Sequence, residues 1–463
     1  MSERDTPQVS ETARRYAARL LRDLGHAPEP ADDFGLHPEH PAVAAARCGL
    51  TSLSGAADAA PQLCPAPLAA CADGALAALA SLAPPGTFSG LRGSALLTER
   101  AAVFGHTRQG ARSPGESCRL LEAADGRIAL NLARPDDWAL LPAWLETDIA
   151  ESWEAVAVAV RAHATANLME RARELGLAVA VEALPVEASS WLSASAAATP
   201  SPHASGERVG VRGRRAPRVL DLSSLWAGPL CTHLLQACGA EVIKLESLQR
   251  PDGARNGPSE FFDLLNAGKR CVALDFSSAQ GRAQLRALIE RADVVVEASR
   301  PRAMRQLGID AEALVRERTG LTWISLTGYG RRAPQDHWIA YGDDAGIAAG
   351  LSALIRIVSG QSVFVGDAIA DPVTGVHAAL AAWASYQQGG SRLISLSLVE
   401  VLRHCIGFEA PVDERGWRRR ANDWHAQAVT TEVAAPTARA PARPAAALGA
   451  DTDAVLREWG IAC

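Results

Sequence analysis

The residue with the strongest case for chemistry is Asp371, which lies in the run GDAIADPVTGVHAALAA at residues 366–382. Pro372 follows the acid, and apolar residues then recur at helical spacing through Leu380. An acid followed by proline and an apolar helical pattern predicts a helix N-cap, which is worth about 1 kcal/mol. The same carboxylate is also a candidate nucleophile, because a carboxyl with a pKa of about 4 is ionised at neutral pH and needs no base.

Other residues with chemical potential are scattered along the chain. The nine cysteines form no CxxC pair, and the eleven histidines form neither an HExxH motif nor a close cluster. This spacing favours buried, reduced thiols over a disulfide framework, and no metal site is expected. The turn LSSLWAGPL lacks the GxGxxG of a dinucleotide site. A helix beginning at 227–229 could accept an anion, although a tight strand-to-helix turn explains those residues equally well.

The composition is that of an ordinary globular protein with two or three domains. The chain has 463 residues, 48% hydrophobic and 21% charged, and is therefore about three times as long as a domain of roughly 150 residues. The net charge of −6 makes nucleic acid an unexpected partner. The charged N-terminus lacks the apolar region of a signal peptide, and no apolar stretch approaches about 18 residues. We therefore expect a cytoplasmic protein without a membrane span.

A regular alternation of strands and helices begins after residue 217. Runs rich in Val, Ile and Leu predict strands at 218–223, 240–246, 271–276, 293–299 and 319–330, with helices at 227–239 and 278–292. Such strands predict an α/β fold, a Rossmann-like parallel sheet with helices on both faces. Ligands of these sheets bind beyond the carboxyl ends of the strands, so the loops there are the first candidates for a site.

The first half of the chain gives weaker signals. Residues 11–24 predict a helix ended by Gly25, and residues 152–176 predict one long helix closed by Gly176. Short strand patterns make this half α+β, and its residues suggest little chemistry. Residues 193–217 are small and polar and contain Pro and Gly, which predicts a linker.

Six motifs occur together and in order in the second half. They are RVLDLSSLWAGPLCTHLLQACGAEVIKLE, NAGKRCVALDF, ADVVVEASRP, SLTGYG, IADPVTGVHAALAA and, near the C-terminus, LGADTDAVLREWGI. From about Arg218 to about Leu402 the chain thereby resembles the family III CoA-transferases, the relatives of formyl-CoA and carnitine CoA-transferases. The resemblance implies that family's fold, with coenzyme A and acyl-CoA as substrates and no permanently bound cofactor.

The resemblance also gives Asp371 a role, because it fills the position of the family's catalytic aspartate. In the family this carboxylate attacks an acyl-CoA thioester. An aspartyl–acyl mixed anhydride forms first and an aspartyl-CoA thioester second, and an acceptor acid then takes the CoA. A helix N-terminus beside Asp371 would favour both the carboxylate and an oxyanion, so capping and nucleophilic roles are compatible.

Candidate CoA contacts follow from the same motifs. They are Ser224, Leu225, Trp226 and Ala227 along the pantetheine and adenine, Leu274 against the adenine, and Ala298 and Ser299 after the motif DVVVE. The last two replace the family's common Asn-Phe pair, as they tend to do in the carnitine branch. Ser247 stands where the family often has a basic residue, with Arg250 nearby.

A racemase branch of the family carries a histidine in a GHD motif ahead of the aspartate. Here the matching stretch is IAYGDDAGIAAG, with Tyr341 or Asp343 at that place, and His337 is displaced. Racemisation by two bases needs a second group that exchanges the α-proton. The missing histidine makes α-methylacyl-CoA racemase the minor interpretation.

The sequence of the first half predicts a degenerate internal repeat of the catalytic region. A shift of 301 residues places Gly49 on Gly350 and Gly74 on Gly375, and it aligns GALAALA with GVHAALA. The shared glycines favour a repeat over a chance match between alanine-rich segments.

The aligned copy lacks the catalytic acid, because Asp371 falls on Ala70. The neighbouring Asp73 is either a helix cap, which we favour, or a relocated acid. The resulting domains are an N-terminal helical segment (1–40), a degenerate repeat with small-domain elements (41–192), the linker (193–217), and a CoA-binding catalytic domain with a C-terminal helix (218–463). Family members form interlocked dimers, so the fused pair either imitates a dimer within one chain or forms a homodimer.

The sequence thus predicts an acyl-CoA:carboxylate CoA-transferase, whose partners are an acyl-CoA and a carboxylate acceptor. The alternative from a different class is a non-catalytic CoA-binding or partner subunit, because the first copy lacks its acid and several CoA contacts are altered. The acyl group and the acceptor acid are not identified by these residues.

Overall fold

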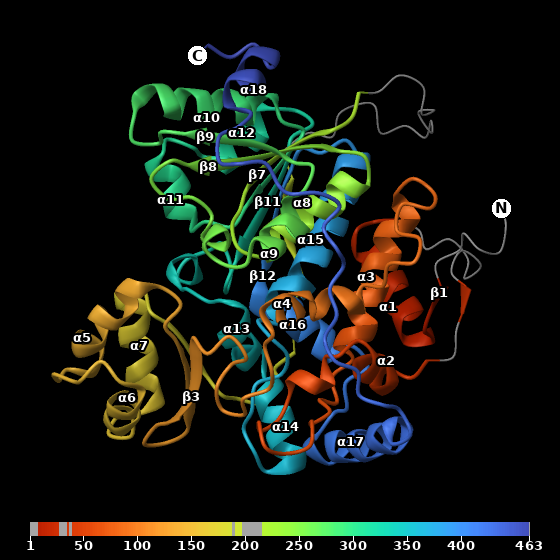
Figure 1. The fold of residues 1–463 in the computed structure, drawn as a ribbon, viewed down its shortest axis with the longest axis vertical. Helices are drawn as coiled ribbons and strands as arrows, with labels where there is room; N and C mark the ends of the chain where they lie inside the picture. Colours follow the sequence, from red (N-terminus) through yellow and green to blue (C-terminus); the bar gives the residue numbers. More distant parts are fainter. Residues whose placement is uncertain (1–7, 27–34, 37–38, 188–189, 197–214, 463) are drawn as a thin grey trace.

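A seven-stranded sheet forms the centre of the molecule, with strand order β6-β12-β11-β10-β7-β8-β9 (Figure 1). Its strands are β6 (Ser193–Ala196), β7 (Arg218–Leu222), β8 (Glu241–Ser247), β9 (Arg270–Leu274), β10 (Val294–Glu297), β11 (Thr322–Thr327) and β12 (Arg392–Ser397). Every pair is parallel except β12 with β6. The protein is seen here in a computed structural model, which describes residues 8–26, 35–36, 39–187, 190–196 and 215–462.

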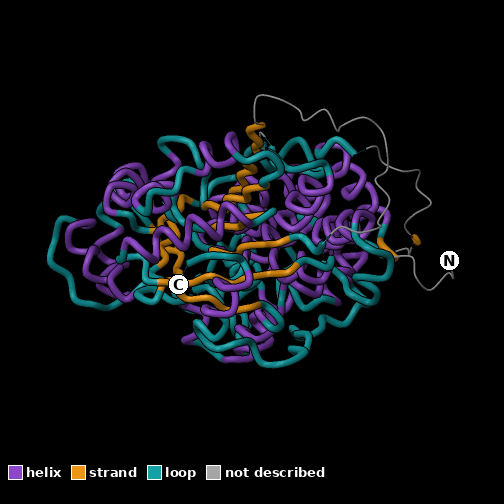
Figure 2. Tube along the Cα trace, turned by 90° about the horizontal axis from the view of Figure 1, so that it is seen from above, coloured by secondary structure: helices purple, strands orange, loops and turns teal. Residues whose placement is uncertain are grey.

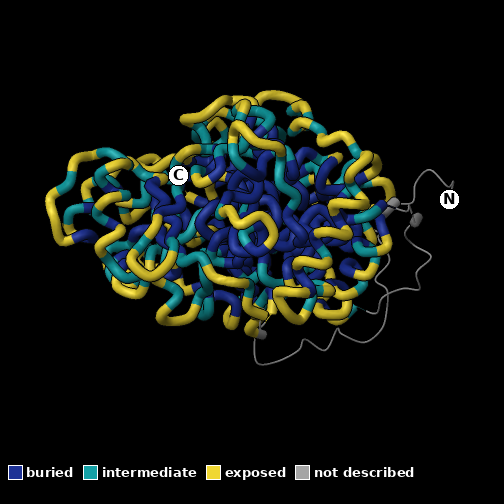
Figure 3. The backbone as a smooth tube through the Cα atoms, turned by 90° about the horizontal axis from the view of Figure 1, so that it is seen from below, coloured by how far each residue is buried: buried dark blue, intermediate teal, exposed yellow. Residues whose placement is uncertain are grey.

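Helices cover both faces of this sheet. On one face pack α8 (Ala227–Ala237) and α15 (Ala370–Gln387), and on the other α10 (Ala279–Arg291), α12 (Ala311–Glu317) and α18 (Thr452–Glu458). The strands therefore lie inside a shell of helices (Figure 2), and the buried residues gather around them (Figure 3). In β10, Val294 and Val296 join the first core and Val295 the second, as the alternation of a strand requires. The predicted parallel α/β fold is confirmed.

The remaining helices surround these layers. In the second half they are α9 (Ser259–Asn266), α11 (Pro301–Gln306), α13 (Gly342–Ala349), α14 (Leu351–Ser359), α16 (Leu398–Gly407) and α17 (Glu414–Ala428). In the first half they are α1 (Glu11–Asp23), α2 (Pro41–Arg47), α3 (Leu68–Leu82) and α4 (Glu99–Phe104), beside a short parallel pair of β1 (Gln8–Val9) and β2 (Gly35–Leu36). No helix within the described ranges is both long and apolar enough to cross a membrane.

A smaller unit of the first half lies beside the large body, at the lower left of Figure 1. Its antiparallel sheet has the order β3 (Cys118–Glu122), β4 (Arg127–Asn131), β5 (Ala178–Val181). Around it pack a 3-10 helix η4 (Pro135–Leu140) and the helices α5 (Leu141–Leu145), α6 (Trp153–Val160) and α7 (Thr165–Leu175). This unit brings β4 and the start of η4 to the edge of the large body.

The single long helix predicted for residues 152–176 is wrong, because α6 and α7 are separate. The turn between β3 and β4 reaches the break between them. There the carbonyl of His163 accepts from the Ala124 N–H at 2.9 Å, and the Asp125 carboxylate accepts from the Thr165 N–H at 2.7 Å. These tertiary bonds satisfy groups at the break that an unbroken helix would have paired internally.

The predicted linker at 193–217 is wrong at its start. Residues Ser193–Ala196 form β6, which pairs antiparallel with β12 at the edge of the central sheet. Residues 197–214 lie outside the described residues. At the far end, Arg215 pairs with Asp293 at 2.9 Å.

Two pairs of helices, one in each half, approach each other in the same way. In the first half a Cβ on Gly74 of α3 would lie 2.5 Å from the carbonyl oxygen of Ala13 in α1. In the second half a Cβ on Gly375 of α15 would lie 2.7 Å from the carbonyl oxygen of Ala227 in α8. Both glycines are needed because backbone lies where a side chain would begin. The helices α3 and α15 also pack on each other, so the two pairs lie side by side (Figure 1).

A second pair of glycines shows the same correspondence. Gly49 and Gly350 have φ of 85° and 103°, in the left-handed region that favours glycine. A Cβ on Gly49 would lie 2.9 Å from the nitrogen of Pro436, and one on Gly350 would lie 2.6 Å from the nitrogen of Pro185. Each glycine therefore meets a proline from the opposite half of the chain.

Candidate active site

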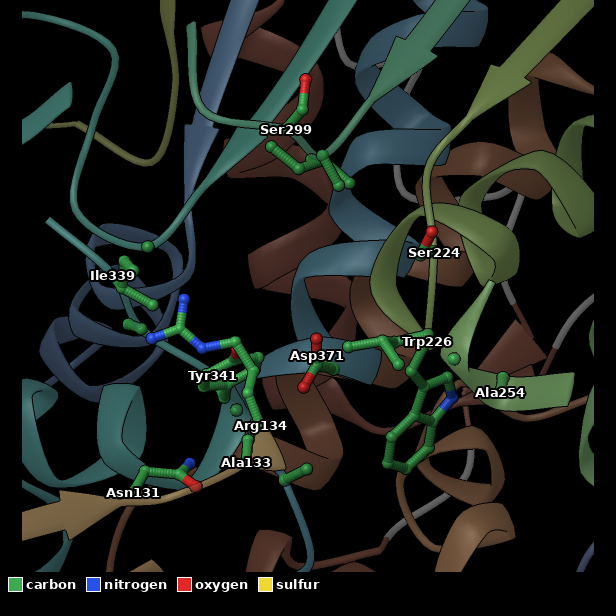
Figure 4. Close-up of a pocket in the computed structure, with 18 of the residues that line it drawn as sticks. Asn131, Ala133, Arg134, Ser224, Trp226, Ala254, Ser299, Ile339, Tyr341 and Asp371 are labelled. Atoms are coloured by element: carbon green, nitrogen blue, oxygen red, sulfur yellow. The ribbon is translucent and has the colours of Figure 1, made fainter. Parts of the chain in front are cut away.

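A pocket of about 860 Å³ opens beyond the carboxyl ends of the neighbouring strands β7, β10 and β11. Ser224 follows β7, Ala298 follows β10 and Thr327 ends β11, and all three line the pocket. In Figure 4 the carboxylate of Asp371 lies between Tyr341 and Trp226. The pocket thus has the position expected of a ligand site in a parallel sheet.

The turn Ser224-Leu225-Trp226 forms one wall of the pocket. Leu225 has φ of 70°, a conformation that a leucine rarely adopts. The Asp252 carboxylate holds this turn by accepting from the Leu225 N–H at 2.9 Å. Asp252 is in turn bound at 2.8 Å by the Nζ of Lys244, which also donates to the carbonyl of Ser223. The lysine of the motif GAEVIKLE therefore supports the pocket wall from below, without contacting the pocket.

A second buried lysine anchors the start of α8. Lys269 Nζ donates to Asp221 at 3.0 Å and to the hydroxyl of Thr232 at 2.7 Å. Burial opposes ionisation of Asp221, yet Lys244 and Lys269 hold the pKa of this carboxyl well below its usual range. Asp221 also accepts from the hydroxyl of Ser223 at 2.5 Å. These contacts join the end of β7 to α8 and set the path of the turn between them.

Asp371 is the second residue of α15, which begins at Ala370 after the N-cap position Ile369. The prediction that Asp371 is the N-cap is therefore wrong. Ala368, with φ of 44°, turns the chain early and accepts the Asp371 N–H at 2.9 Å. The carboxylate is thereby left partly exposed in the pocket wall, where the Gly342 N–H donates to it.

The surroundings of Asp371 disfavour its charged form. Burial raises the pKa of Asp371 to about 7, and nearby Asp343 and Asp367 act in the same direction, while Arg100 opposes them. Burial and the charge of Asp367 likewise raise the pKa of Asp343 to about 6. Asp371 is therefore a mixture of acid and carboxylate at neutral pH, unlike the fully ionised group expected from its residue type.

Arg100 brings a positive charge from the first half to this acidic cluster. Its Nη1 lies 2.7 Å from Asp367 Oδ1, and His106 Nδ1 lies 3.1 Å from Asp367 Oδ2. The Asp367 side chain has no exposed surface, so this carboxylate depends on its two partners. Arg100 itself lines the pocket together with Asp371.

The small unit closes another side of the pocket with Asn131 and Arg134 (Figure 4). The Asn131 amide donates to Asp344 of α13 at 2.9 Å, while burial raises the pKa of Asp344 to about 7. Arg134 is held by Asp137, with 2.8 Å between Nε and Oδ1, and by the carbonyl of Gly176 at 2.7 Å. Arg134 is thus held by groups of the first half, whereas Asn131 is held by a contact with the second half.

Three further arginines line the pocket besides Arg100. They are Arg134, Arg250 and Arg300. The pKa of Arg300 is lowered by burial first and then by the charges of neighbouring arginines, which include Arg134 and Arg250. Among the described residues, neither Arg250 nor Arg300 has an acidic partner or a side-chain hydrogen bond. Arg250 and Arg300 thus form a cationic surface without an acidic partner among the described residues, whereas Arg134 is paired with Asp137.

Most of the candidate CoA contacts reach this pocket. Those in its lining are Ser224, Leu225, Trp226, Ala298 and Ser299. The Ser299 hydroxyl is engaged by Glu297 at 2.7 Å. Two candidates lie elsewhere. Ala227 is buried at the start of α8 with its carbonyl against Gly375. Leu274 points into the core beneath α10, because it lies on the inner face of the edge strand β9.

Sequence reasoning missed the contribution of the first half, which supplies Arg100, Asn131 and Arg134. The first half looked chemically silent because each of these residues is isolated in the sequence. Arg134 precedes Pro135 in an ordinary turn pattern, and Arg100 sits on a short helix. Nothing local distinguishes them from solvent-exposed charges.

Asp73 is neither a cap of its own helix nor part of this pocket. It lies in the middle of α3, pairs with Arg92 at 2.7 Å and accepts from the Ser94 N–H at 2.7 Å. Arg92 also pairs with Glu39. Around the position that matches Asp371, the first half therefore has a closed ion-pair network in place of an open carboxylate.

The position of the racemase histidine holds no imidazole. Tyr341 and Asp343 both line the pocket, whereas the exposed His337 pairs with Asp336 at 3.6 Å. Among the described lining residues of the pocket there is no histidine. In the part of the chain that the structure describes, no group of three or more His, Cys, Asp or Glu side chains is arranged to hold a metal ion.

The comparisons with known proteins find relatives of the second half. Residues 215–436 match the family model described as CoA-transferase family III. An acyl-CoA transferase of Fusarium pseudograminearum is 33% identical over 202 residues, which cover 40% of this chain and 44% of that protein. The succinate–glutarate CoA-transferase of Agrobacterium fabrum is 30% identical over 207 residues, 40% of this chain and 50% of that protein. The chain thus spans about half the length of these curated relatives.

Solved structures of similar proteins match the same share of the chain. A CAIB/BAIF family protein from Brucella suis is 26% identical and has a TM-score of 0.35, covering 40% of this chain and 53% of that one. The resemblance inferred from the motifs of the second half is confirmed by the family model and the curated relatives.

Proposed function

We propose that this chain, in which residues 215–436 form a segment of the CoA-transferase family III, moves CoA from an acyl-CoA to a carboxylic acid with Asp371 as its nucleophile. The observation that carries the proposal is the carboxylate of Asp371 in the wall of an open pocket of about 860 Å³. The relatives named above are an acyl-CoA transferase and a succinate–glutarate CoA-transferase, and CoA thioesters are the substrates this family implies.

The reaction proceeds through two covalent forms of Asp371. Its carboxylate attacks the thioester carbonyl of the acyl-CoA, the C–S bond breaks, and CoA leaves as a thiolate. The thiolate then attacks the aspartyl carbonyl of the mixed anhydride, releasing the donor acid as a carboxylate and forming an aspartyl-CoA thioester. The acceptor carboxylate repeats these two steps in reverse and leaves as an acyl-CoA, and Asp371 is free again.

The cationic surface of the pocket supports the binding of CoA. Its phosphates carry several negative charges, and guanidinium groups bind phosphate with paired hydrogen bonds. Arg250 and Arg300 have no acidic partner among the described residues, so they are available for this role. Arg250 is also close in sequence to Ser247, the position at which the family resemblance implies a basic residue, and in this proposal Arg250 binds phosphate in its place.

The first half is proposed to replace a partner subunit. It supplies pocket residues in cis, and its helices α1 and α3 pack as α8 and α15 do. The predicted internal repeat would account for both features, with Ala70 in place of the acid in the first copy. Sedimentation equilibrium of the active protein should then give a single chain of 48.6 kDa. Activity confined to a dimer would contradict this part of the proposal.

Replacement of the nucleophile tests the function directly. Asp371→Ala should lower transfer about a thousandfold or more, and it should abolish the aspartyl-CoA adduct that hydroxylamine traps in the wild-type protein. Asp310→Asn is a suitable control, because Asp310 caps α12 away from the pocket and asparagine caps helices equally well. Retained transfer by Asp371→Ala would remove Asp371 from the reaction.

The two alternatives predict different observations. A non-catalytic CoA-binding subunit would bind CoA in calorimetry and show no turnover across a broad panel of acyl-CoA thioesters. An α-methylacyl-CoA racemase would wash deuterium into Cα of a 2-methylacyl-CoA without any acceptor acid. The absence of histidine from the described pocket lining gives the racemase little support.

A further inference from the structure

Arg100 reaches the pocket from the half of the chain that does not carry Asp371. Arg100 belongs to the short helix α4. The preceding residue, Glu99, anchors this helix. The Glu99 carboxylate, 1% exposed, lies 2.6 Å from Arg439. Arg439 also lies 2.9 Å from His233 of α8. With α4 held in this way, the Arg100 side chain is directed into the lining of the pocket.

Among the described residues, the Arg100 guanidinium makes a hydrogen bond through one of its nitrogens alone. Nη1 donates to the buried Asp367 at 2.7 Å. Nε and Nη2 have no acceptor among the described residues. The guanidinium carbon lies 5.4 Å from the centre of the Phe104 ring, which also lines the pocket. The result is a positioned cation with unused N–H donors, and a guanidinium in this state binds carboxylates well.

The charge around Arg100 changes during the proposed reaction. Four titratable groups face it or its partner, namely Asp343, Asp367, Asp371 and His106. Asp367 is committed to Arg100 and His106 throughout. When Asp371 is ionised, it adds a negative charge that repels any incoming carboxylate. When Asp371 is converted to its aspartyl-CoA thioester, that charge is lost.

We propose that Arg100 binds the carboxylate of the acceptor acid, and that this subsite opens only when Asp371 has become a neutral covalent adduct. The inference rests on the proposed function and extends it to the class of the second substrate. The bound carboxylate lies next to the aspartyl carbonyl that it attacks, and the C–S bond then breaks with CoA thiolate as the leaving group. The free enzyme thus takes the acyl-CoA first, and the acceptor acid binds only to the covalent enzyme.

A binding experiment without turnover tests this subsite. Asp371→Asn gives the neutral side chain of the intermediate, and succinate serves as the carboxylate probe. By calorimetry at about pH 8, where wild-type Asp371 is ionised, Asp371→Asn should bind succinate about tenfold more tightly than the wild type. As the pH falls to about 6.5, the wild-type affinity should rise, because protonation of Asp371 removes the same charge. The Asp371→Asn affinity should change less, because only the smaller part of Asp343 that is protonated at this pH adds to it.

The role of Arg100 is isolated in variants that keep the fold intact. Arg100→Gln is combined with Asp367→Asn, so that no buried carboxylate is left without a partner. In the Asp371→Asn background this pair should lower succinate affinity about tenfold or more relative to Asp367→Asn alone. Arg100→Lys should keep part of the affinity, because it retains the charge. Arg171→Gln is the matched control, since Arg171 pairs with Glu146 at 2.5 Å with similar exposure but outside the pocket.

Two results would overturn the inference. One is unchanged succinate affinity after the loss of Arg100, and the other is no succinate binding by Asp371→Asn. Neither depends on catalysis. Failure of the proposed function would instead show as the absence of a hydroxylamine-trappable adduct in the wild-type protein, so the two failures are distinguishable.

Discussion

Gly342 lies directly against the carboxylate of Asp371. A Cβ on Gly342 would lie 2.3 Å from Asp371 Oδ2 and 2.4 Å from the carbonyl oxygen of Ala368. The Gly342 N–H also donates to the same carboxylate. The direction in which Asp371 points is therefore set by the missing side chain at the start of α13.

Gly342→Ala should displace the Asp371 carboxylate and slow formation of the aspartyl adduct about a hundredfold, because a misplacement of about 1 Å can cost that much. Single-turnover trapping with hydroxylamine measures this rate. Gly346→Ala, in the same helix, is the control, since a Cβ there would make only ordinary contacts of 3.4 Å and 3.6 Å. Equal rates for the two variants would show that Gly342 does not position the acid.

The pH dependence of adduct formation should follow the ionisation of Asp371. Burial raises the pKa of this carboxyl to about 7, and only the carboxylate attacks, so the rate should rise with pH through about 7 and level off above it. Asp343→Asn removes a negative neighbour and should move the midpoint to lower pH. A profile already level at about pH 5 would mean that Asp371 keeps an ordinary pKa in its reacting state.

Lys244→Met should destabilise the protein by about 3–5 kcal/mol, because Asp252 would be left buried without its partner at 2.8 Å. Urea unfolding followed by circular dichroism gives the change. The double variant Lys244→Met, Asp252→Asn should recover part of the loss, since it leaves no buried charge unpaired. A loss below about 1 kcal/mol in the single variant would show that the turn at Leu225 does not depend on this ion pair.

The close helix contacts at Gly74 in the first half and Gly375 in the second predict the same effect of an added methyl group. Gly74→Ala and Gly375→Ala should each destabilise the protein by about 1–3 kcal/mol, because each Cβ would meet a backbone carbonyl of the neighbouring helix. Gly407→Ala is the control, since no atom lies within 4 Å of a Cβ there. If only one of the first two variants is destabilised, the halves do not share this contact in solution.

The strands β7 to β11, the helices α8, α10 and α15, and the family resemblance of the second half could be predicted from the sequence, whereas the edge strand β6 and its neighbour β12 were not predicted. A hydrophobic run such as the one that forms β10 predicts a strand by itself, because its apolar pattern lies within one short stretch of the sequence. Asp371 could likewise be predicted as a candidate nucleophile, because its motif lies within one segment of the sequence. Its supposed cap role failed because the left-handed turn at Ala368 starts the helix two residues earlier, at Ala370.

What remained for the tertiary structure to decide was how the two halves share one pocket. Arg100 and Asp367 are 267 residues apart, and no periodicity or motif links residues at such a distance. The pKa of Asp371 is likewise a property of the groups that the fold gathers around it, and the sequence alone predicted an ordinary carboxylate. The sequence by itself determined which elements form and which acid is a candidate nucleophile, since those signals are local. Only the packing of the first half against the second determined which charges face that acid, because electrostatic interactions depend on distance in space and not along the chain.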